Sequence, residues 1–552
     1  MASVALALLT ALAGQASAKT VKSATPQMGW NSYNYYNCYP SEAIIKDNAR
    51  AVVETGLAEA GYTTVTTDCG WPARDRAADG QLVWNPDLFP SGGGRELGEY
   101  VHNLGLKFGV YSGGGYFQCG SEDQPASLNN EGIDAKSFAD WGADSLKYDN
   151  CYAVGPTVMV DFTHPDAASP DRFVAMAEAI NATDRDMLYQ VCQWGAGTDL
   201  GTWAPKIGNS WRISNDIFNS WRSIWRIANQ VVPFYKHTGP GAFPDMDMLI
   251  VGLNALSYEE EKFHMALWAI NKSPLTLGAP AIPGLAPEHT LSIVANKEVI
   301  AINQDPLARQ AQLVRRFTEE EWDVWAGELS GSRRVVALAN WKNDTQTVAL
   351  DLADVLGLSS ATARDVWAGA DLGPVTGQFE TALKGHELRL LVLSDLVEAA
   401  TARASAGYYD AADATLSGRA NHVACGGAEG RCLPTGGKVV DLGWGDGVAF
   451  SNVTAATAGK KLLGVDFVNY ELAFESAWQS GSNTRNMSVS VNGGRPKRWA
   501  FPISGGSWYE AGRLLVEVDG FNAGGGNTVE FGNFEAHWAP DLVGFELFED
   551  AK

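Results

Sequence analysis

The stretch SLKYDNC, residues 145–151, places a lysine and a carboxylate together after a short apolar run. In an extended strand Lys147 and Asp149 point to the same face, and the ammonium group would then favour the ionised carboxylate and lower its pKa. A structural ion pair is the alternative interpretation. A second arginine–carboxylate pair, Arg212 and Asp216, lies in the segment SWRISND.

Two carboxyl groups that meet across a substrate can break a glycosidic bond, one ionised and the other protonated. The pattern makes Asp149 the candidate nucleophile and Asp216 the candidate acid. Arg212 would hold a substrate hydroxyl or Asp216 itself, and a permanent Arg212–Asp216 ion pair would make Asp216 a poor acid.

The elements that must position these residues alternate between residue 25 and about residue 305. Helical segments, such as 40–55 and 171–181, separate short apolar segments that are typical of strands. Eight such strands, each followed by a helix or loop, predict a (β/α)8 TIM barrel. A doubly wound open sheet is the alternative, and it is disfavoured because no GxGxxG turn follows the first strand. The expected strands are QMGWNSY, YTTVTTDC, LKFGVYS, DSLKYDN, MLYQVCQ, SWRISND, DMLIVG and SPLTLGA.

Polar or aromatic residues recur where these strands end. Any one of them could be a helix N-cap or part of a satisfied ion pair, but a barrel brings all strand ends to one face, where active sites lie. The set therefore predicts an active site formed by Trp30, Asp68, Tyr111, Lys147, Asp149, Gln193, Arg212, Asp216 and Asp247.

Later segments alternate apolar and polar residues with frequent turns, as all-β domains do. We expect a catalytic barrel at 24–310, an antiparallel β-sandwich domain at 311–396, a linker at 397–407 and a C-terminal β-sandwich of jelly-roll type at 408–550.

The charge composition disfavours some classes of binding partner. With 41 basic and 64 acidic residues the chain has a net charge of -23, which disfavours nucleic acid and anionic membranes. Residues 1–18 have the pattern of a signal peptide ending in Ala16-Ser17-Ala18, and no other apolar run is long enough to cross a bilayer. We therefore predict a secreted protein, with glycosylation sequons at Asn181, Asn343, Asn452 and Asn486 and a weaker one at Asn271.

Seven cysteines in an oxidising compartment predict disulfides, with at least one cysteine unpaired. Cys425 and Cys432 are a short loop apart and are expected to pair. The sequence has no CxxC pair or histidine cluster, so we predict no metal site and no cofactor.

The ordered motifs of the first 395 residues resemble glycoside hydrolase family 27, the α-galactosidases and their relatives. The motifs are MGWNSY (28–33), TTDCGW (66–71), GLKFGVYS (105–112), FADWGADSLKYDNCY (138–152), NSWRISNDI (209–217), GPGAFPDMDML (239–249), WAINKSPLTLGA (268–279) and INQDP (302–306).

The resemblance implies a retaining exo-α-galactosidase acting on galactose-containing oligo- or polysaccharides. It assigns Asp149 as nucleophile and Asp216 as acid/base, with sugar contacts from Trp30, Asp68, Tyr111, Lys147, Arg212 and Asp247. It also implies the pairs Cys38–Cys69 and Cys119–Cys151, which leave Cys192 free.

Two departures from the family pattern bear on the sugar. Thr67 replaces the first aspartate of an Asp-Asp-Cys-Trp pattern, a partner of the sugar's primary hydroxyl, which raises β-L-arabinopyranoside as the alternative substrate. The variant TTDCGW also resembles the multidomain fungal-type branch of α-galactosidases. Gln193 stands in CQW where CEW is common; it can bond a 2-hydroxyl but is bulkier than the residue that admits an N-acetyl group, so an α-N-acetylgalactosaminidase is disfavoured. The non-enzyme alternative, an inactive sugar-binding protein, is disfavoured because both acids are present.

The C-terminal segment resembles carbohydrate-binding modules of the CBM35/CBM6 type. Ala412 stands where these modules carry a calcium-binding glutamate, so the sequence leaves calcium binding by this segment open. The sequence leaves the oligomeric state open.

Overall fold

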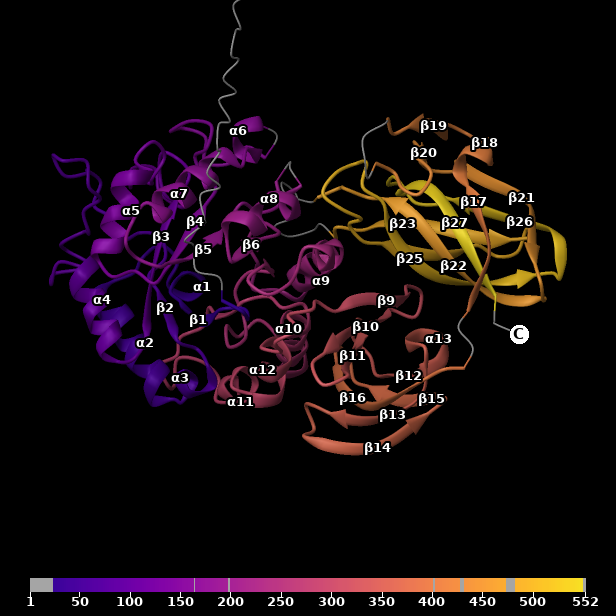
Figure 1. Cartoon of the computed structure of the whole chain (residues 1–552), viewed down its shortest axis with the longest axis horizontal. Coiled ribbons are helices and arrows are strands. Elements are labelled where there is room, and N and C mark those ends of the chain that lie inside the picture. Colours follow the sequence, from indigo (N-terminus) through magenta and orange to yellow (C-terminus); the bar gives the residue numbers. More distant parts are fainter. Residues whose placement is uncertain are drawn as a thin grey trace, which may run out of the picture.

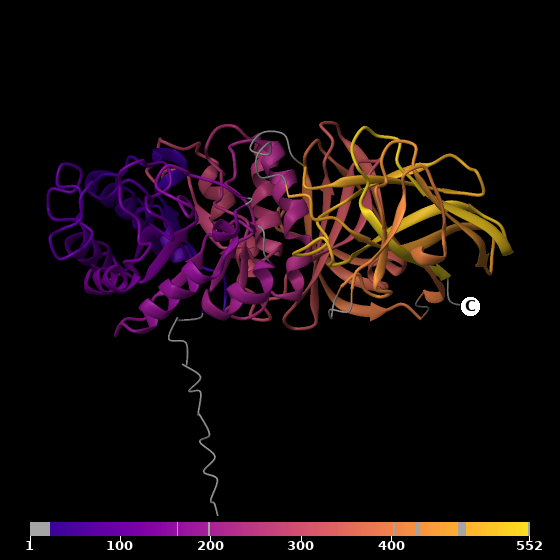
Figure 2. The ribbon, with the colours of Figure 1, turned by 90° about the horizontal axis from the view of Figure 1, so that it is seen from above.

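The computed structural model describes residues 23–549, except 163, 197–198, 401–402, 427–430 and 473–481. The predicted signal peptide, 1–18, lies outside the described residues. Three domains follow one another along the chain, from the indigo and magenta barrel to the salmon β domain and the orange and yellow sandwich (Figure 1). They form an elongated body with the barrel at one end (Figure 2).

Eight parallel strands form the barrel. Their order in the sheet is β7-β6-β5-β4-β3-β2-β1-β8. Consecutive strands are therefore paired from β1 to β7, and β8 pairs with β1. A parallel bridge between Leu249 and Leu277 closes the ring. The strands are β1 (Met28–Asn31), β2 (Thr64–Thr66), β3 (Lys107–Gly113), β4 (Ser145–Asp149), β5 (Leu188–Val191), β6 (Ser210–Arg212), β7 (Phe243–Asp245) and β8 (Leu275–Leu277).

Helices connect these strands and bury their apolar faces against the barrel, in a core that includes Trp211, Trp268 and Phe108. They are α1 (Tyr33–Tyr36), α2 (Glu42–Glu54), α3 (Leu57–Ala60), α4 (Gly94–Asn103), α5 (Glu131–Asp140), α6 (Pro165–Ala168), α7 (Asp171–Asn181), α8 (Leu200–Ile207), α9 (Trp221–Val231), the 3-10 helix η1 (Val232–Lys236), α10 (Tyr258–Ile270), α11 (Thr290–Val294) and α12 (Lys297–Asn303).

The seventh strand is displaced from its predicted position. We expected it at 247–252, but β7 ends at Asp245. Asp247 has φ of 79°, in the left-handed region, so the chain turns there and cannot continue as a strand. Of the expected segment only Leu249 returns to the sheet, in the bridge that closes the barrel.

The second domain packs a six-stranded antiparallel sheet against a two-stranded one, over a core that includes Val336, Leu350 and Leu391. Its elements are β9 (Gln312–Phe317), β10 (Trp322–Leu329), β11 (Arg333–Asn340), β12 (Gln346–Asp351), α13 (Leu352–Leu356), β13 (Leu358–Asp365), β14 (Ala370–Thr376), β15 (Gln378–Leu383) and β16 (Leu388–Glu398).

The third domain is a sandwich of two sheets, ordered β19-β20-β27-β22-β25, with β17 on β27, and β18-β21-β26-β23-β24. Phe467, Phe501 and Phe545 lie in its core. Its elements are β17 (Ala404–Asp410), η2 (Ala411–Asp413), β18 (Thr415–Ser417), β19 (Asn421–Ala424), β20 (Gly437–Val440), β21 (Gly447–Ala455), β22 (Gly459–Val468), β23 (Arg485–Val491), β24 (Lys497–Phe501), β25 (Gly512–Phe521), β26 (Gly524–Gly532) and β27 (Asp541–Glu549).

The fold class predicted from the sequence is therefore confirmed: a barrel followed by two β-sandwich domains. The linker is shorter than the predicted 397–407. Val397 and Glu398 still pair with β13, and β17 begins at Ala404, because residues at both ends of the expected linker find partners in neighbouring strands.

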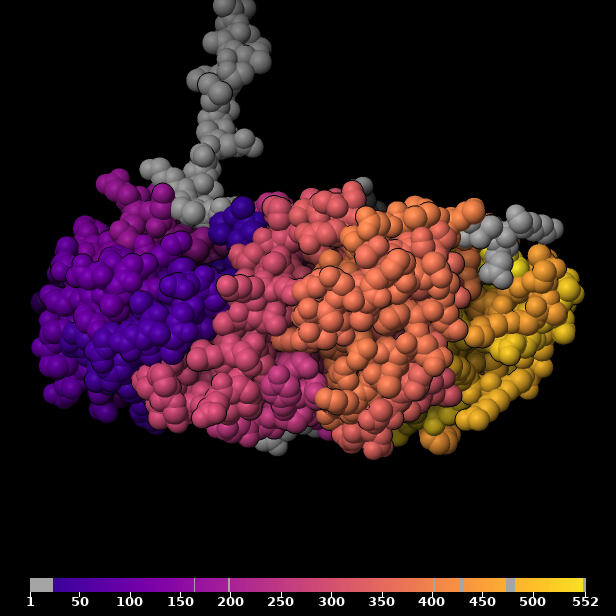
Figure 3. Space-filling view, turned by 90° about the horizontal axis from the view of Figure 1, so that it is seen from below, coloured from indigo at the N-terminus to yellow at the C-terminus, as the bar shows by residue number. Residues whose placement is uncertain are grey.

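Arg316 of β9 connects all three domains. It forms a buried ion pair with Asp323 of β10, and it donates to the Asn229 side chain of α9 and to the Ala500 carbonyl of β24. The space-filling view shows the three regions in continuous contact along one face (Figure 3). Within the described residues, no helix combines the length and apolarity needed to cross a bilayer.

Candidate active site

Asp149 is the last residue of β4, and both of its carboxylate oxygens are held. The Tyr111 hydroxyl donates to Oδ2 at 2.9 Å, and the Asn150 backbone amide donates to Oδ1 at 3.0 Å. Asp149 is 6% exposed. Burial raises the pKa of its carboxyl above the ordinary value, and the nearby Asp216 adds to this shift, although Lys147 opposes it.

The partner of Lys147 differs from the one that adjacency in the sequence suggested. Its ammonium forms an ion pair with Asp68, at 2.9 Å, across one strand of the barrel. Asn31 donates to the same Asp68 oxygen at 2.7 Å. The Lys147 ammonium does act to lower the pKa of Asp149, as predicted. The predicted lowering of the pKa as a whole is wrong, because the effect of burial is larger than that of Lys147.

A second group of charges forms around Arg212, at the end of β6. Its guanidinium contacts Asp216 at 2.9 Å and Asp247 at 2.8 Å. Asp247 is fixed further by the backbone amides of Ile217 and Met248, at 2.6 and 2.7 Å. Asp216 therefore shares its arginine with a better-anchored carboxylate, so the Arg212–Asp216 contact is not an exclusive ion pair.

Asp216 also differs from its neighbours in access to solvent. Its side chain is 28% exposed, compared with 4% for Arg212 and 3% for Asp247. The Asp216 carboxylate is therefore the most accessible member of this charged group.

Tyr33 joins the two charged groups, and the sequence analysis did not identify it as a site residue. The Asp216 carboxylate, followed by burial, raises the pKa of its hydroxyl well above the ordinary value. The Lys147 ammonium lies 5.5 Å from the Tyr33 ring and 5.2 Å from the Tyr111 ring, within cation–π range. Its place in MGWNSY, two residues after β1, was the available clue.

Trp30 and Gln193 lie deeper than the charged residues. The Trp30 ring is 1% exposed, and its indole donates to the Ala279 carbonyl at 2.9 Å. Gln193 is fully buried; its amide donates to the Ala196 carbonyl at 2.8 Å, while Oε1 has no hydrogen-bond partner among the described residues.

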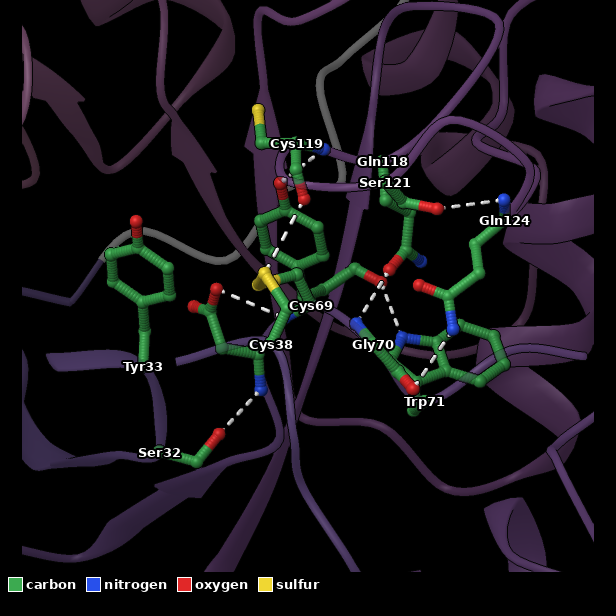
Figure 4. Close-up of a disulfide and its surroundings, with 12 residues drawn as sticks. Ser32, Tyr33, Cys38, Cys69, Gly70, Trp71, Gln118, Cys119, Ser121 and Gln124 are labelled. Atoms are coloured by element: carbon green, nitrogen blue, oxygen red, sulfur yellow. Dashed lines mark hydrogen bonds between the residues drawn. A yellow bond between two sulfur atoms is a disulfide. The ribbon is translucent and has the colours of Figure 1, made fainter. Parts of the chain in front are cut away.

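Disulfides fix the loops beside the site. Cys38–Cys69 and Cys119–Cys151 form as expected, and so does Cys425–Cys432 in the C-terminal sandwich. Figure 4 shows the bond between Cys38 and Cys69. Cys69 follows Asp68 directly, and its amide donates to Asp68 Oδ1 at 3.0 Å. Cys151 lies two residues beyond Asp149. Each barrel disulfide thus holds a loop adjoining an acidic residue of the site.

Cys192 is buried and forms no disulfide with any described residue, as expected. Burial raises the pKa of its thiol well above the ordinary value, and the Asp149 carboxylate adds to the shift. Arg212 contacts its sulfur at 3.7 Å. The thiol of Cys192 is therefore neutral, and it lies beside Arg212 and within electrostatic reach of Asp149.

The predicted sequons differ in accessibility. Asn343 and Asn452 are exposed, whereas Asn181 and Asn486 are half-buried. Asn271 is fully buried and donates to the Leu267 carbonyl, an arrangement that excludes a glycan in the folded state.

In the described part of the chain, no three His, Cys, Asp or Glu side chains are arranged to hold a metal ion.

The structure thus gathers the nine predicted residues around the carboxyl ends of the barrel strands. Two acids that interact electrostatically, one buried and one partly exposed, are surrounded by hydrogen-bonding side chains. Hydrolysis of a glycosidic bond requires two carboxyl groups in one site, and this arrangement supplies them.

Comparison with known proteins specifies the family. A family model described as alpha galactosidase A matches residues 25–305, and one described as the alpha galactosidase C-terminal beta sandwich domain matches 319–393. Alpha-galactosidase D of Emericella nidulans is 38% identical over 637 aligned residues, which cover 95% of each chain. The chain belongs to the α-galactosidase family, glycoside hydrolase family 27.

Two solved structures are also similar. Alpha-galactosidase I of Mortierella vinacea is 34% identical with a TM-score of 0.63, covering 68% of this chain and 99% of its own. A β-L-arabinopyranosidase of Geobacillus stearothermophilus is 25% identical with a TM-score of 0.60, covering 67% and 96%. The protein is thus a galactoside hydrolase of the α-galactosidase type.

Proposed function

We propose that the protein removes terminal non-reducing α-D-galactosyl residues from oligo- and polysaccharides by double displacement. The observation that carries this proposal is the pairing of a buried, doubly hydrogen-bonded Asp149 with the more exposed Asp216 in one electrostatically connected site.

In the first step, an Asp149 oxygen bonds to the anomeric carbon as the bond to the leaving oxygen breaks. Asp216 gives its proton to that oxygen, so the leaving group departs as a neutral alcohol. In the second step, Asp216 takes a proton from water, the water oxygen bonds to the anomeric carbon, and Asp149 is released. Two inversions give a product with the starting α configuration.

The other site residues would hold the sugar. Asp68, Lys147 and Asp247 are already fixed by ion pairs and backbone amides, so they present defined donors and acceptors without much loss of rotamer freedom. Tyr111 fixes the nucleophile, and Gln193 Oε1 offers an acceptor.

The decisive experiment compares kcat/KM on p-nitrophenyl α-D-galactoside and p-nitrophenyl β-L-arabinopyranoside. We expect the galactoside to be preferred by about 10-fold or more, since loss of one substrate hydroxyl leaves its binding groups unpaired. Proton NMR of the first product should show α-galactose before mutarotation. Preference for the arabinopyranoside, or β-galactose as the first product, would contradict the proposal.

β-L-Arabinopyranosidase activity is the second candidate. Thr67 stands where the family pattern has the aspartate that holds the primary hydroxyl, and its own hydroxyl is buried without a hydrogen-bond partner in the described part of the chain. The similarity to a β-L-arabinopyranosidase supports the same possibility. The paired assay above separates the two sugars.

We also propose that the C-terminal sandwich binds carbohydrate. Trp444, Phe534 and Trp538 are 67%, 55% and 43% exposed, on the loops 441–446 and 533–540. Backbone hydrogen bonds from Gly445 to Asn533 and from Ala539 to Leu442 join these loops. Flat exposed rings on fixed loops suit stacking against sugar faces.

Replacing Trp444 and Trp538 together by alanine tests this role. We expect KM on a galactose-bearing polysaccharide to rise about 10-fold, because the attached substrate loses one of two binding sites. The kcat/KM on the p-nitrophenyl galactoside should stay unchanged. Tyr258→Ala, which removes an exposed aromatic ring of α10, is the control. An unchanged KM on the polysaccharide in the tryptophan variant would refute binding by these loops.

Secretion follows from the same proposal, since polymers are met outside the cell. The pattern of residues 1–18, the disulfides and the exposed sequons at Asn343 and Asn452 support it. Amino-terminal sequencing of the protein from the culture medium is the test, with a start near Lys19 expected.

A further inference from the structure

The loop that carries Asp216 depends on a helix behind it. Asp216 lies in the turn that follows β6, and α9 packs beneath that turn. Arg226 of α9 donates to the Asp216 backbone carbonyl at 2.8 Å and also binds the Asn215 side chain. Gln230, one turn later, donates to the Ile213 carbonyl. Two side chains of α9 therefore hold the backbone at both ends of the turn.

These two α9 side chains are themselves buried. Arg226 is 1% exposed and Gln230 is 3% exposed. Burial lowers the pKa of Arg226 to about 10, which still leaves the guanidinium charged at neutral pH. Their hydrogen bonds form in a low-dielectric interior, where loss of one partner has a large effect on the position of the other.

The C-terminal sandwich reaches the same helix with one buried side chain. Asn483 lies two residues before β23 and is 3% exposed. Its amide nitrogen donates to Gln230 Oε1 at 2.9 Å and to the Arg226 backbone carbonyl at 3.1 Å. In Figure 1 the sandwich lies beside α9.

The hydrogen bond from Asn483 decides which way the Gln230 carboxamide points. A carboxamide has one donating and one accepting end. With Oε1 occupied by Asn483, the nitrogen of Gln230 must face Ile213, which lies next to Arg212. Without that donor, Gln230 would lose its preference for this orientation, and the turn would lose one of its two supports.

We propose that Asn483 is a positioning residue for the acid/base Asp216, and that the C-terminal sandwich thereby forms part of the catalytic apparatus. One path of hydrogen bonds between buried groups runs from Asn483 through the Gln230 side chain to the Ile213 carbonyl. A second contact fixes the Arg226 backbone, and the Arg226 side chain holds Asn215 and the Asp216 carbonyl. The inference rests on the proposed function of Asp216 and deepens it.

The substitution Asn483→Asp tests the proposal with little change of shape. Aspartate keeps the size of the side chain and tolerates the backbone φ of 53°, but its carboxylate cannot donate to Gln230 or Arg226. We expect kcat/KM on methyl α-galactoside, whose leaving group needs a proton, to fall about 10-fold. On 2,4-dinitrophenyl α-galactoside, whose leaving group needs none, it should change less than about twofold.

Asn483→Gly serves as a second variant, because glycine accepts the left-handed backbone and removes the side chain altogether. Lys236→Met is the matched control. It breaks the Lys236–Glu510 ion pair, another contact of 2.9 Å between the barrel and the sandwich, which does not lead to the Asp216 turn. We expect the control to treat both galactosides alike.

The difference between leaving groups identifies the role, since general loosening of the barrel would lower both rates equally. Equal losses on both galactosides, or no loss in either folded Asn483 variant, would overturn the proposal. Its failure is distinguishable from failure of the proposed function, in which the unchanged protein would itself not hydrolyse α-galactosides. If the protein prefers β-L-arabinopyranosides, the same two leaving groups on that sugar give the same test.

Discussion

Replacement of Asp149 by asparagine is expected to lower kcat on p-nitrophenyl α-galactoside by about 10⁴-fold or more, because no oxygen remains to form the glycosyl ester. Asparagine keeps the shape of the side chain and can still accept from the Tyr111 hydroxyl. Circular dichroism and thermal melting should therefore match those of the unchanged protein. Steady-state assay with the two proteins side by side gives the ratio.

A second substitution assigns the face of attack. In Asp149→Ala, azide can enter the space of the carboxylate and bond to the anomeric carbon from the β face. With 2,4-dinitrophenyl α-galactoside as substrate, the expected product is β-galactosyl azide, released together with dinitrophenolate. Recovery of activity without the β-azide product would remove Asp149 from the nucleophile role.

Asp144→Asn is the matched control, because it removes a carboxylate that lies immediately before the same strand, at its amino end. Asp144 binds His102 and Arg185, far along β4 from the site, so its loss should affect stability rather than kcat. A comparable loss of kcat in this variant would show that turnover responds to any disturbance of β4.

The raised pKa of Asp149 adds a pH dependence to this prediction. The nucleophile must be ionised, so activity is lost as pH falls through its pKa. Because burial raises that pKa, the pH at which kcat/KM falls to half its maximum on the acid side should lie above the ordinary aspartate pKa of about 3.9. An acid side at or below that value would contradict the direction of the shift.

Geometry explains why most of this site could be predicted from the sequence. Parallel strands in a barrel end on one face, so residues such as Asp68, Tyr111 and Asp149 converge although they are far apart in sequence. The cysteines next to Asp68 and Asp149 gave a further indication, because each disulfide anchors a loop at that face.

The contacts that the sequence did not reveal are those without periodicity. Lys147 lies two residues from Asp149 yet pairs with Asp68, 79 positions away, because the ends of β4 and β2 lie on either side of β3 in the barrel. Tyr33 lies just beyond a strand end, where its ring could equally have belonged to the core. Asn483 contacts residues 253 and 257 positions earlier, in another domain, and no local pattern marks it.

Backbone conformation accounts for the misplaced seventh strand. The apolar run 247–252 has the composition of a strand, but Asp247 must turn to accept from Ile217 and Met248 while facing Arg212. The strained φ of 79° at this residue is thus associated with the site. A functional contact overrides the local preference there.

Replacement of Asp216 by alanine is expected to affect the two chemical steps differently, which separates its role from that of Asp149. On methyl α-galactoside, kcat/KM should fall about 10³-fold, because the leaving alkoxide receives no proton. On 2,4-dinitrophenyl α-galactoside, kcat/KM should fall less than about 10-fold, since that leaving group departs without one. Pre-steady-state assay should then show a burst of dinitrophenolate, as the galactosyl-enzyme accumulates without a base to activate water.

Azide should restore turnover in Asp216→Ala with the opposite anomer from the one predicted for Asp149→Ala. Here azide needs no base and attacks the galactosyl-enzyme from the α face, which gives α-galactosyl azide and releases Asp149. Arg212→Lys is the informative companion, because it weakens the hold on Asp216 while leaving both acids in place. If the Asp216 variant lost both substrates equally and produced no α-azide, the acid/base would have to be another group, and the shared Arg212 contact with Asp216 and Asp247 would be structural only.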